Sequence, residues 1–178
     1  RCHNVESVIL KRYLAYEKNP FRKLLLRIQS ERLYNYESKI VKYFNKCIMI
    51  SDNDKKIIQV MNPQAQVTTI NPGLDIINSN RQPIHPQEIL FVGTMDWLPN
   101  EDAVLWFATK VFPLIQEVIK EVKFVIIGNK PTLKVQSLTS NEDIVVNGQV
   151  KNLIKYYQKT SVIVVPLRFG SGIKIKII

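Results

Sequence analysis

Hydrophobic and polar positions are spaced differently in the two halves of the chain. In residues 21–45, apolar side chains recur every three to five positions between charged ones, which predicts one long amphipathic helix. Short apolar runs at 46–51 and 66–70 predict strands on either side of a second helix that Asp52 would cap. The side chains expected to form the apolar face of the long helix are Leu25, Ile28, Leu33, Tyr36, Ile40 and Phe44.

From residue 88 onward, short and continuous apolar runs alternate with helical patterns. The predicted strands are 88–93, 123–128, 143–148 and 161–166, and the predicted helices are 100–119, 131–138, 151–159 and a helix start at 172–178. Asn100 is expected to cap the first of these helices, with acidic residues in its first turn. Fully apolar strands that alternate with helices are typical of a parallel sheet covered on both faces, so the sequence predicts an α/β fold.

A linker is expected at residues 76–88, which are polar, contain proline and show no periodicity. It would divide the chain into a first part, 1–75, and a second part, 89–178. Because the chain starts without Met and ends about one turn into the last predicted helix, we expect a fragment of a longer protein.

Composition narrows the function only slightly. The chain has 178 residues, 46% of them hydrophobic, and a formal net charge of +10. A basic surface attracts polyanions, anionic lipids and phosphorylated small molecules alike, and a plain solvated helix face explains the charge equally well. Cys2 and Cys47 lack the spacing of a zinc site or a disulfide framework, which favours thiols in a reducing cytoplasm.

Candidate chemistry gathers where the predicted strands end. Glycine follows the first three strands of the second half, and a cation and paired glycines follow the fourth; the segments are Gly93-Thr94, Gly128-Asn129, Gly148 and Arg168 to Gly172. Ligands of a doubly wound sheet bind at the carboxyl ends of its strands, where glycines and helix N-termini suit phosphate. The chain contains no G-x-G-x-x-G after the first of these strands and no Walker A motif, so dinucleotide and P-loop sites are not supported.

Several blocks of the chain resemble family 4 glycosyltransferases of the GT-B fold. "FVGTMDWLPNEDAVLWF", "IIGN", "VNGQV" and "VVPLRFGSGIKIKII" are similar to the C-terminal half of that family, and "HNVES", "CIMISDND" and "TTINPGLD" are similar to the end of its N-terminal domain. The resemblance implies a Rossmann-like donor-binding domain at 89–178 with helices on both faces of its sheet. It also implies that residues 1–75 are the end of a second Rossmann-like domain, which holds the acceptor.

The resemblance further implies an enzyme that transfers a sugar with retention from a nucleotide-diphosphate sugar to a glycan or lipid-linked acceptor. We expect a bacterial-type, cytoplasmic enzyme of polysaccharide biosynthesis that needs no metal ion or cofactor. Its expected partners include no nucleic acid, and a peripheral contact with the inner face of the membrane is left open. Carried over by position, His3 and Asn4 would be the catalytic residues facing the donor sugar. The donor-binding positions would be Gly93, Thr94, Met95, Gly128, Gly148, Val150, Arg168, Gly170, Ser171, Gly172 and Lys176.

Two departures from the family pattern keep other functions open. The second Glu of the family's Glu-x7-Glu motif would follow Ile178, and Ser171 stands in the place of the first. The fragment is therefore expected to be inactive alone, and a catalytically degenerate sugar-nucleotide-binding module is the alternative. "INPGLD" also exchanges Asn and Pro relative to the family's "IPNGVD". A nucleic-acid-binding protein is disfavoured because the charge is spread along helices without interleaved aromatic residues.

Overall fold

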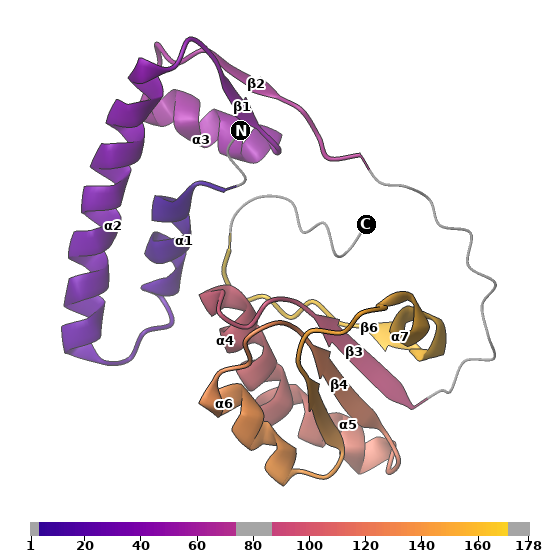
Figure 1. Ribbon diagram of the computed structural model, residues 1–178. Coiled ribbons are helices and arrows are strands. Elements are labelled where there is room, and N and C mark those ends of the chain that lie inside the picture. Colours follow the sequence, from indigo (N-terminus) through magenta and orange to yellow (C-terminus); the bar gives the residue numbers. More distant parts are fainter. Residues whose placement is uncertain (1–3, 74–86, 171–178) are drawn as a thin grey trace. The chain divides into compact units, whose positions relative to one another are not determined.

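The computed structural model describes residues 4–73 and 87–170, which form two compact units (Figure 1). Unit 1 comprises Arg1–Asp75 with Phe169–Ile178, and unit 2 comprises Ile76–Arg168. Almost all of the predicted linker and the whole predicted helix start at 172–178 lie outside the described residues.

Unit 1 contains the long helix and both short strands that the sequence predicts. Its elements are α1 (Glu6–Tyr13), α2 (Pro20–Ile40) with a 3-10 turn at Val41–Tyr43, β1 (Cys47–Met49), α3 (Asp52–Met61) and β2 (Val67–Thr69). The two strands pair in parallel, with Cys47 opposite Val67. Asn19 caps α2 by accepting hydrogen bonds from the N–H groups of Phe21 and Arg22, and Pro20 then supplies the fixed backbone angle of a helix start.

The predicted cap of α3 is wrong by one residue. The hydroxyl of Ser51 accepts hydrogen bonds from the N–H groups of Asn53 and Asp54, so Ser51 is the N-cap. Asp52 is the first helical residue, where its negative charge still complements the positive end of the helix dipole.

The predicted apolar face of α2 is also wrong, because much of it faces solvent. The exposed fraction is 60% for Leu25, 45% for Ile28, 60% for Tyr36 and 58% for Phe44. The carboxylate of Glu37 instead accepts hydrogen bonds from the backbone N–H groups of Glu6 and Ser7, at 2.8 and 3.2 Å, and from the Ser7 hydroxyl. The N-cap residue of α1 provides no side-chain acceptor for the free N–H groups of the first turn. Glu37 supplies that acceptor, so the side of α2 that carries Glu37 faces α1.

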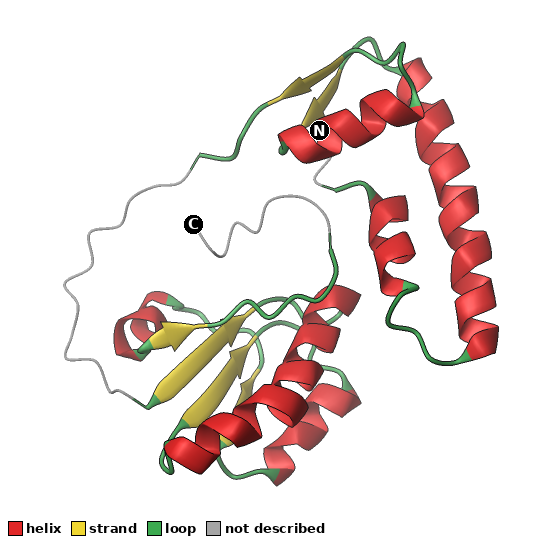
Figure 2. Ribbon diagram, turned by 180° about the vertical axis from the view of Figure 1, so that it is seen from behind, coloured by secondary structure: helices red, strands yellow, loops and turns green. Residues whose placement is uncertain are grey.

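Unit 2 is a parallel sheet with helices on both faces, which confirms the predicted fold class. Its strands are β3 (Glu88–Val92), β4 (Lys123–Ile127), β5 (Ile144–Asn147) and β6 (Val162–Ile163), and their order is β5-β4-β3-β6. The helices α4 (Leu98–Trp106), α5 (Phe112–Val118) and α6 (Leu133–Gln136) cover one face, and α7 (Ile154–Lys159) lies on the other (Figures 1 and 2).

The side chains of β3 alternate between two hydrophobic clusters, one on each face of the sheet. Ile89 and Phe91 belong to the larger cluster beneath α4, α5 and α6, whereas Leu90 packs toward Leu153 and Tyr156 beside α7. Leu90 and Phe91 are both fully buried, as expected for the middle of a doubly covered sheet.

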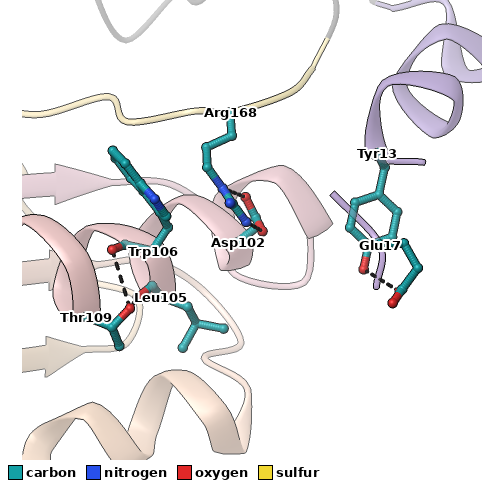
Figure 3. A network of polar contacts seen from close by, with 7 residues as sticks. All are labelled: Tyr13, Glu17, Asp102, Leu105, Trp106, Thr109 and Arg168. Carbon is teal, nitrogen blue, oxygen red and sulfur yellow. Dashed lines mark hydrogen bonds and ion pairs between the residues drawn. The ribbon is translucent and has the colours of Figure 1, made fainter. Parts of the chain in front are cut away.

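The helix predicted at 100–119 is divided into α4 and α5 by a π-helical turn at Phe107–Val111. Pro113 lies in the first turn of α5 and has no N–H group to continue the preceding ladder, which accounts for the interruption. Thr109 donates its hydroxyl to the carbonyl of Leu105 at 2.7 Å within this turn (Figure 3). The expected cap at Asn100 is wrong, because the helix already starts at Leu98 and Asn100 is buried inside its first turn.

Candidate functional site

The strand order of unit 2 defines where a ligand site is expected. From β3 the chain moves outward to β4 and β5, and then returns to place β6 on the opposite side of β3. Such a reversal is a topological switch point, and parallel α/β sheets bind ligands outside the carboxyl ends of the strands that flank it. In this sheet, the loop after β3 starts at Gly93 and the segment after β6 reaches Arg168.

The loops after β3 and β4 are locked to each other through their backbones. Gly93 donates its N–H to the carbonyl of Ile127, and Met95 donates its N–H to the carbonyl of Asn129, both at 2.9 Å. A Cβ atom at Gly128 would lie only 1.8 Å from the carbonyl oxygen of Gly93. Glycine at this position is therefore required for the close approach of the two loops.

The loop after β3 is also held by the side chains of four residues. Thr94 donates its hydroxyl to Asp96 at 2.6 Å, and the ammonium of Lys130 lies 3.0 Å from the other Asp96 oxygen. The Thr94 hydrogen bond, followed by that of Lys130, lowers the pKa of the Asp96 carboxyl below its usual value. The buried amide of Asn100 donates to the carbonyl of Thr94 at 2.8 Å. Together these contacts pre-organise the loop at the edge of the switch point.

Lys130 is a cation at this edge that the sequence interpretation did not select. Its backbone has φ of 51°, a left-handed conformation that is uncommon for residues other than glycine and is often found at functional sites. The sequence feature that could have identified Lys130 as a site residue is its position two residues after Gly128, in the loop that follows β4.

The guanidinium of Arg168 is fixed at the carboxyl end of β6 by an ion pair with α4. Its Nε donates to one carboxylate oxygen of Asp102 at 2.8 Å, and its Nη2 pairs with the other oxygen (Figure 3). The guanidinium carbon also lies 6.0 Å from the ring centroid of Trp106. A bidentate pair of this kind restricts the orientation of the cation. Asp102 is not among the site residues expected from the sequence, although it is one of the acidic residues of the predicted first helical turn.

Three further predicted donor residues lie at strand ends of unit 2. The side chain of Met95 is 1% exposed and belongs to the hydrophobic core, so only its backbone can line a site. Val150 is partly buried against the α7 side of the sheet. Nothing lies within 4 Å of the position that a Cβ atom would take at Gly148, which leaves open space at the end of β5.

The remaining predicted residues belong to unit 1 or lie outside the described residues. The Asn4 amide is 3.4 Å from the carboxylate of Glu6, at the start of α1. Gly170 accepts a hydrogen bond from the guanidinium of Arg12 through its carbonyl, and next to it the ring of Phe169 lies 4.9 Å from that of Tyr13. The residues without a described position are His3, Ser171, Gly172 and Lys176.

Two adjoining cavities occur in unit 1, between its helices. Their volumes are about 520 and 390 Å³, and both are lined by Lys11, Ser30 and Tyr34. The larger cavity lies along α1 and α2, and the smaller one extends to α3. Neither is lined by residues of the strand ends described above.

Comparison with known proteins decides the family. The family described as "Glycosyl transferases group 1" matches residues 86–178, about half of the chain. The chain belongs to the group 1 glycosyltransferases. An uncharacterized 44.6 kDa protein from the cps region of Klebsiella pneumoniae is 25% identical over 195 residues, which cover 99% of this chain and 47% of that protein. The chain thus spans about half the length of this curated relative.

Solved structures similar to this glycosyltransferase chain share its fold at low sequence identity. TarM matches with a TM-score of 0.60 and 14% identity, over 74% of this chain and 27% of TarM. An S. aureus TarM variant, crystallised with fondaparinux, α-GlcNAc-glycerol and UDP, matches with a TM-score of 0.59 and 14% identity, over the same shares. The GtfA/B complex matches with a TM-score of 0.54 and 16% identity, again over 74% of this chain and 27% of its own. These matches confirm a GT-B-type α/β fold.

The described part of this glycosyltransferase chain contains neither a cluster of metal-ligand residues nor a membrane-spanning helix. Residues 4–73 and 87–170 contain no group of three or more His, Cys, Asp or Glu residues placed to hold a metal ion. No helix within the same ranges is both long enough and apolar enough to cross a membrane.

Proposed function

We propose that this group 1 glycosyltransferase is a retaining enzyme of family 4 that transfers a sugar from a nucleotide-diphosphate sugar to a glycan or lipid-linked acceptor. The observation that carries the proposal is the strand order β5-β4-β3-β6, with glycine after three of the strand ends and Arg168 after the fourth. This arrangement places backbone groups and a fixed cation along the carboxyl edge of a sheet whose topological switch point lies between β3 and β6.

The chemistry of sugar transfer fits such a site. As the glycosidic bond breaks, the departing nucleotide diphosphate gains negative charge. Oriented N–H groups and a positioned cation stabilise charge at the place where it develops, without a side-chain nucleophile. Arg168 is suited to this role because its orientation is already set by Asp102. Gly148 would let the nucleotide approach the backbone, since the space beside it is open.

The comparisons support the substrate class. The S. aureus TarM variant was crystallised with UDP and a GlcNAc derivative, and the Klebsiella relative is encoded in a cps region. For this chain, nucleotide-sugar binding, polysaccharide biosynthesis, transfer without a metal ion and a cytoplasmic location are parts of the proposal. His3 and Asn4 would face the donor sugar from the acceptor domain.

The experiment that tests the donor site is a thermal-shift titration with UDP, GDP, ADP and their sugar conjugates. Binding to the folded state alone raises the unfolding temperature, by about 5 to 10 °C for a chain of this size at a ligand concentration about 100 times Kd. We expect one nucleotide to give this shift and one sugar conjugate to increase it. The absence of a shift with every nucleotide and conjugate would refute donor binding by this chain.

A pair of glycine variants separates site binding from nonspecific stabilisation. Neither Gly148 nor Gly73 has an atom within 4 Å of the position that a Cβ atom would take, so a side chain can be added at either place. Gly148→Val should abolish the nucleotide shift, whereas Gly73→Val, in unit 1, should retain it. Circular dichroism of both variants verifies that the fold is unchanged.

A catalytically degenerate sugar-nucleotide-binding module is the second candidate. Ser171 stands where the family pattern has its first Glu, which favours this alternative. The two functions differ in turnover. A transferase that includes the family's second Glu should release nucleotide from the conjugate that binds best and form a product with the donor's anomeric configuration. Binding of the conjugate without release of nucleotide would show that the protein is a binding module without catalysis.

A further inference from the structure

Asp102 and Trp106 lie on one side of α4 and contact the same side chain. They are four residues apart, which places them one turn apart on a single face of the helix. The carboxylate of Asp102 accepts hydrogen bonds from Nε and Nη2 of Arg168 (Figure 3). The guanidinium lies over the ring of Trp106, with 6.0 Å between its central carbon and the ring centroid. We refer to Asp102 and Trp106 as the guanidinium clamp.

The two members of the guanidinium clamp restrict Arg168 in different ways. The paired hydrogen bonds to Asp102 fix the direction of the guanidinium within its own plane. An aromatic ring against its face limits the tilt of that plane. The Asp102 side chain is 15% exposed, so its charge is screened less than that of a surface acid. Together the two contacts hold the cation in one orientation.

Trp106 is itself held by the hydrophobic core beneath α4. It packs against the larger cluster of unit 2, and the rings of Phe107 and Phe112 lie 4.8 and 5.7 Å from that of Phe124. Five residues span about 140° around a regular α-helix, so Phe107 and Phe112 would point in different directions there. In the π-helical turn at Phe107–Val111, the N–H of Phe112 binds the carbonyl of Phe107, which keeps both rings on the core side.

The π-helical turn directly follows the helix that carries the guanidinium clamp. Thr109 donates its hydroxyl to the carbonyl of Leu105 at 2.7 Å, and the same hydroxyl lies 3.5 Å from the carbonyl of Trp106 (Figure 3). These contacts give the carbonyls before the turn a side-chain donor. Such turns inside α-helices occur frequently at functional sites. In this chain the turn begins one residue after the ring that supports Arg168.

The charge of Asp102 opposes the binding of an anion near Arg168. It repels phosphate and offsets the positive charge of the guanidinium. A site that depended on charge alone would bind phosphate better without this acid. The acid can favour anion binding only through geometry, because a cation that is already oriented loses less side-chain freedom when it binds phosphate oxygens.

We propose that the guanidinium clamp positions Arg168 for the diphosphate of the nucleotide sugar, and that Asp102 strengthens the binding of this anion despite its own negative charge. Asp102 and Trp106 are positioning residues, which act through Arg168 and not by contact with the donor. The inference rests on the proposed function and deepens it, because it names the residues that prepare the cation of the same site.

Isothermal titration calorimetry of the 178-residue chain with UDP, GDP and ADP measures the effect of each variant on Kd. The matched pair is Asp102→Asn and Glu101→Gln, which remove one negative charge from neighbouring positions of α4. Glu101 accepts a hydrogen bond from Thr132 at 2.9 Å, so its replacement leaves the guanidinium clamp intact. Asp102→Asn should raise the Kd of the nucleotide that binds about tenfold. Glu101→Gln should leave that Kd unchanged or lower it slightly.

A second set of variants tests whether Asp102 acts through the arginine. Arg168→Lys keeps the positive charge but cannot form the bidentate pair. Asp102→Asn should therefore weaken binding much less in the Arg168→Lys background than in the unchanged chain. Trp106→Leu should raise Kd about threefold, and Trp106→Phe, which retains an aromatic face, should restore most of the affinity. Circular dichroism verifies that every variant is folded.

The geometry of the guanidinium clamp can also be measured without nucleotide. In NMR spectra of the ¹⁵N-labelled chain, the Nε–H of Arg168 should be protected from exchange with water. Arg168→Lys lacks this signal and so identifies it. Protection should remain in Glu101→Gln and be lost in Asp102→Asn, because only Asp102 accepts the Nε–H hydrogen bond.

The outcomes separate this inference from the proposed function. If the unchanged chain binds no nucleotide, the donor site is refuted, and a protected Nε–H would then show a structural ion pair only. If the unchanged chain binds a nucleotide and Asp102→Asn binds it equally or more tightly, the positioning role alone is overturned. Equal weakening by Glu101→Gln, or an undiminished effect of Asp102→Asn in the Arg168→Lys background, would overturn it as well.

Discussion

Replacing Gly128 with alanine would place a methyl group 1.8 Å from the carbonyl oxygen of Gly93 and 2.8 Å from its carbonyl carbon. Ordinary contacts of a Cβ atom lie between 3.4 and 4 Å. The obstructing atoms are backbone, and Gly93 is itself tied to Ile127 by a 2.9 Å hydrogen bond. Rotation of a side chain therefore cannot relieve the overlap, and the two strand ends must separate.

The size of the effect follows from this geometry. Insertion of a methyl group into a well-packed region destabilises a protein by about 1 to 3 kcal/mol, and occasionally by more. Because the overlap is with backbone at the ends of the two central strands, we expect Gly128→Ala to lower the free energy of unfolding by about 3 kcal/mol or more. The unfolding temperature should fall by roughly 6 to 12 °C if the chain unfolds as a whole, and by about twice that if unit 2 unfolds separately.

Urea denaturation followed by circular dichroism measures this loss, and Gly148→Ala is its matched control. Gly148 also follows a parallel strand, but no atom lies within 4 Å of its Cβ position. Gly148→Ala should leave stability unchanged or raise it by up to about 1 kcal/mol, because alanine restricts the unfolded chain. If Gly128→Ala were as stable as Gly148→Ala, the close approach of the loops after β3 and β4 would be refuted.

Three further predictions concern carboxylates. Glu37→Gln should lower the free energy of unfolding by about 1 to 2 kcal/mol in urea denaturation, because it weakens the acceptor at the start of α1. Its control is Glu31→Gln, which changes an exposed acid on α2 and should have almost no effect. Asp102→Asn should lower the free energy of unfolding by about 1 to 2 kcal/mol in the same assay, since the Arg168 side chain is 29% exposed and water screens part of the ion pair. An unchanged urea midpoint would mean that this ion pair does not stabilise the fold. NMR titration should find the pKa of Asp96 below 3.8, chiefly because of the Thr94 hydrogen bond and then that of Lys130. These contacts should support the fold above pH 3.8, and their contribution should be lost as the pH falls through the lower folded-state pKa. A pKa at or above 3.8 would contradict the hydrogen bonds found there.

Much of unit 2 could be predicted from sequence because its signals are local. Each apolar run became a parallel strand, and Gly93, Gly128 and Gly148 follow three of those strands as expected. Exact helix starts were less predictable. Asn100 and Ser51 are both plausible caps by residue type, and only the backbone conformation shows that Ser51 caps a helix whereas Asn100 binds Thr94.

The roles of individual side chains required contacts between distant residues. Asp102 and Arg168 are 66 positions apart, and no local pattern links them. The partnership of Glu37 with the start of α1 spans 30 residues and determines which side of α2 is packed. Periodicity alone measures how amphipathic a helix is, but it does not say whether the apolar side meets the core or the surroundings.

The amino-acid sequence by itself determined an α/β architecture, the glycines at its strand ends and the family of the chain, because periodicity, turn residues and motifs are properties of neighbouring positions. Only the tertiary structure decided that β6 lies beside β3, which creates the switch point, and that Gly128 has no room for a side chain whereas Gly148 has. It also decided that Leu25 and Ile28 of α2 face solvent. These features depend on which distant segments pack together. The free energy of that packing depends on residues far apart in the chain, so no short stretch of sequence determines it.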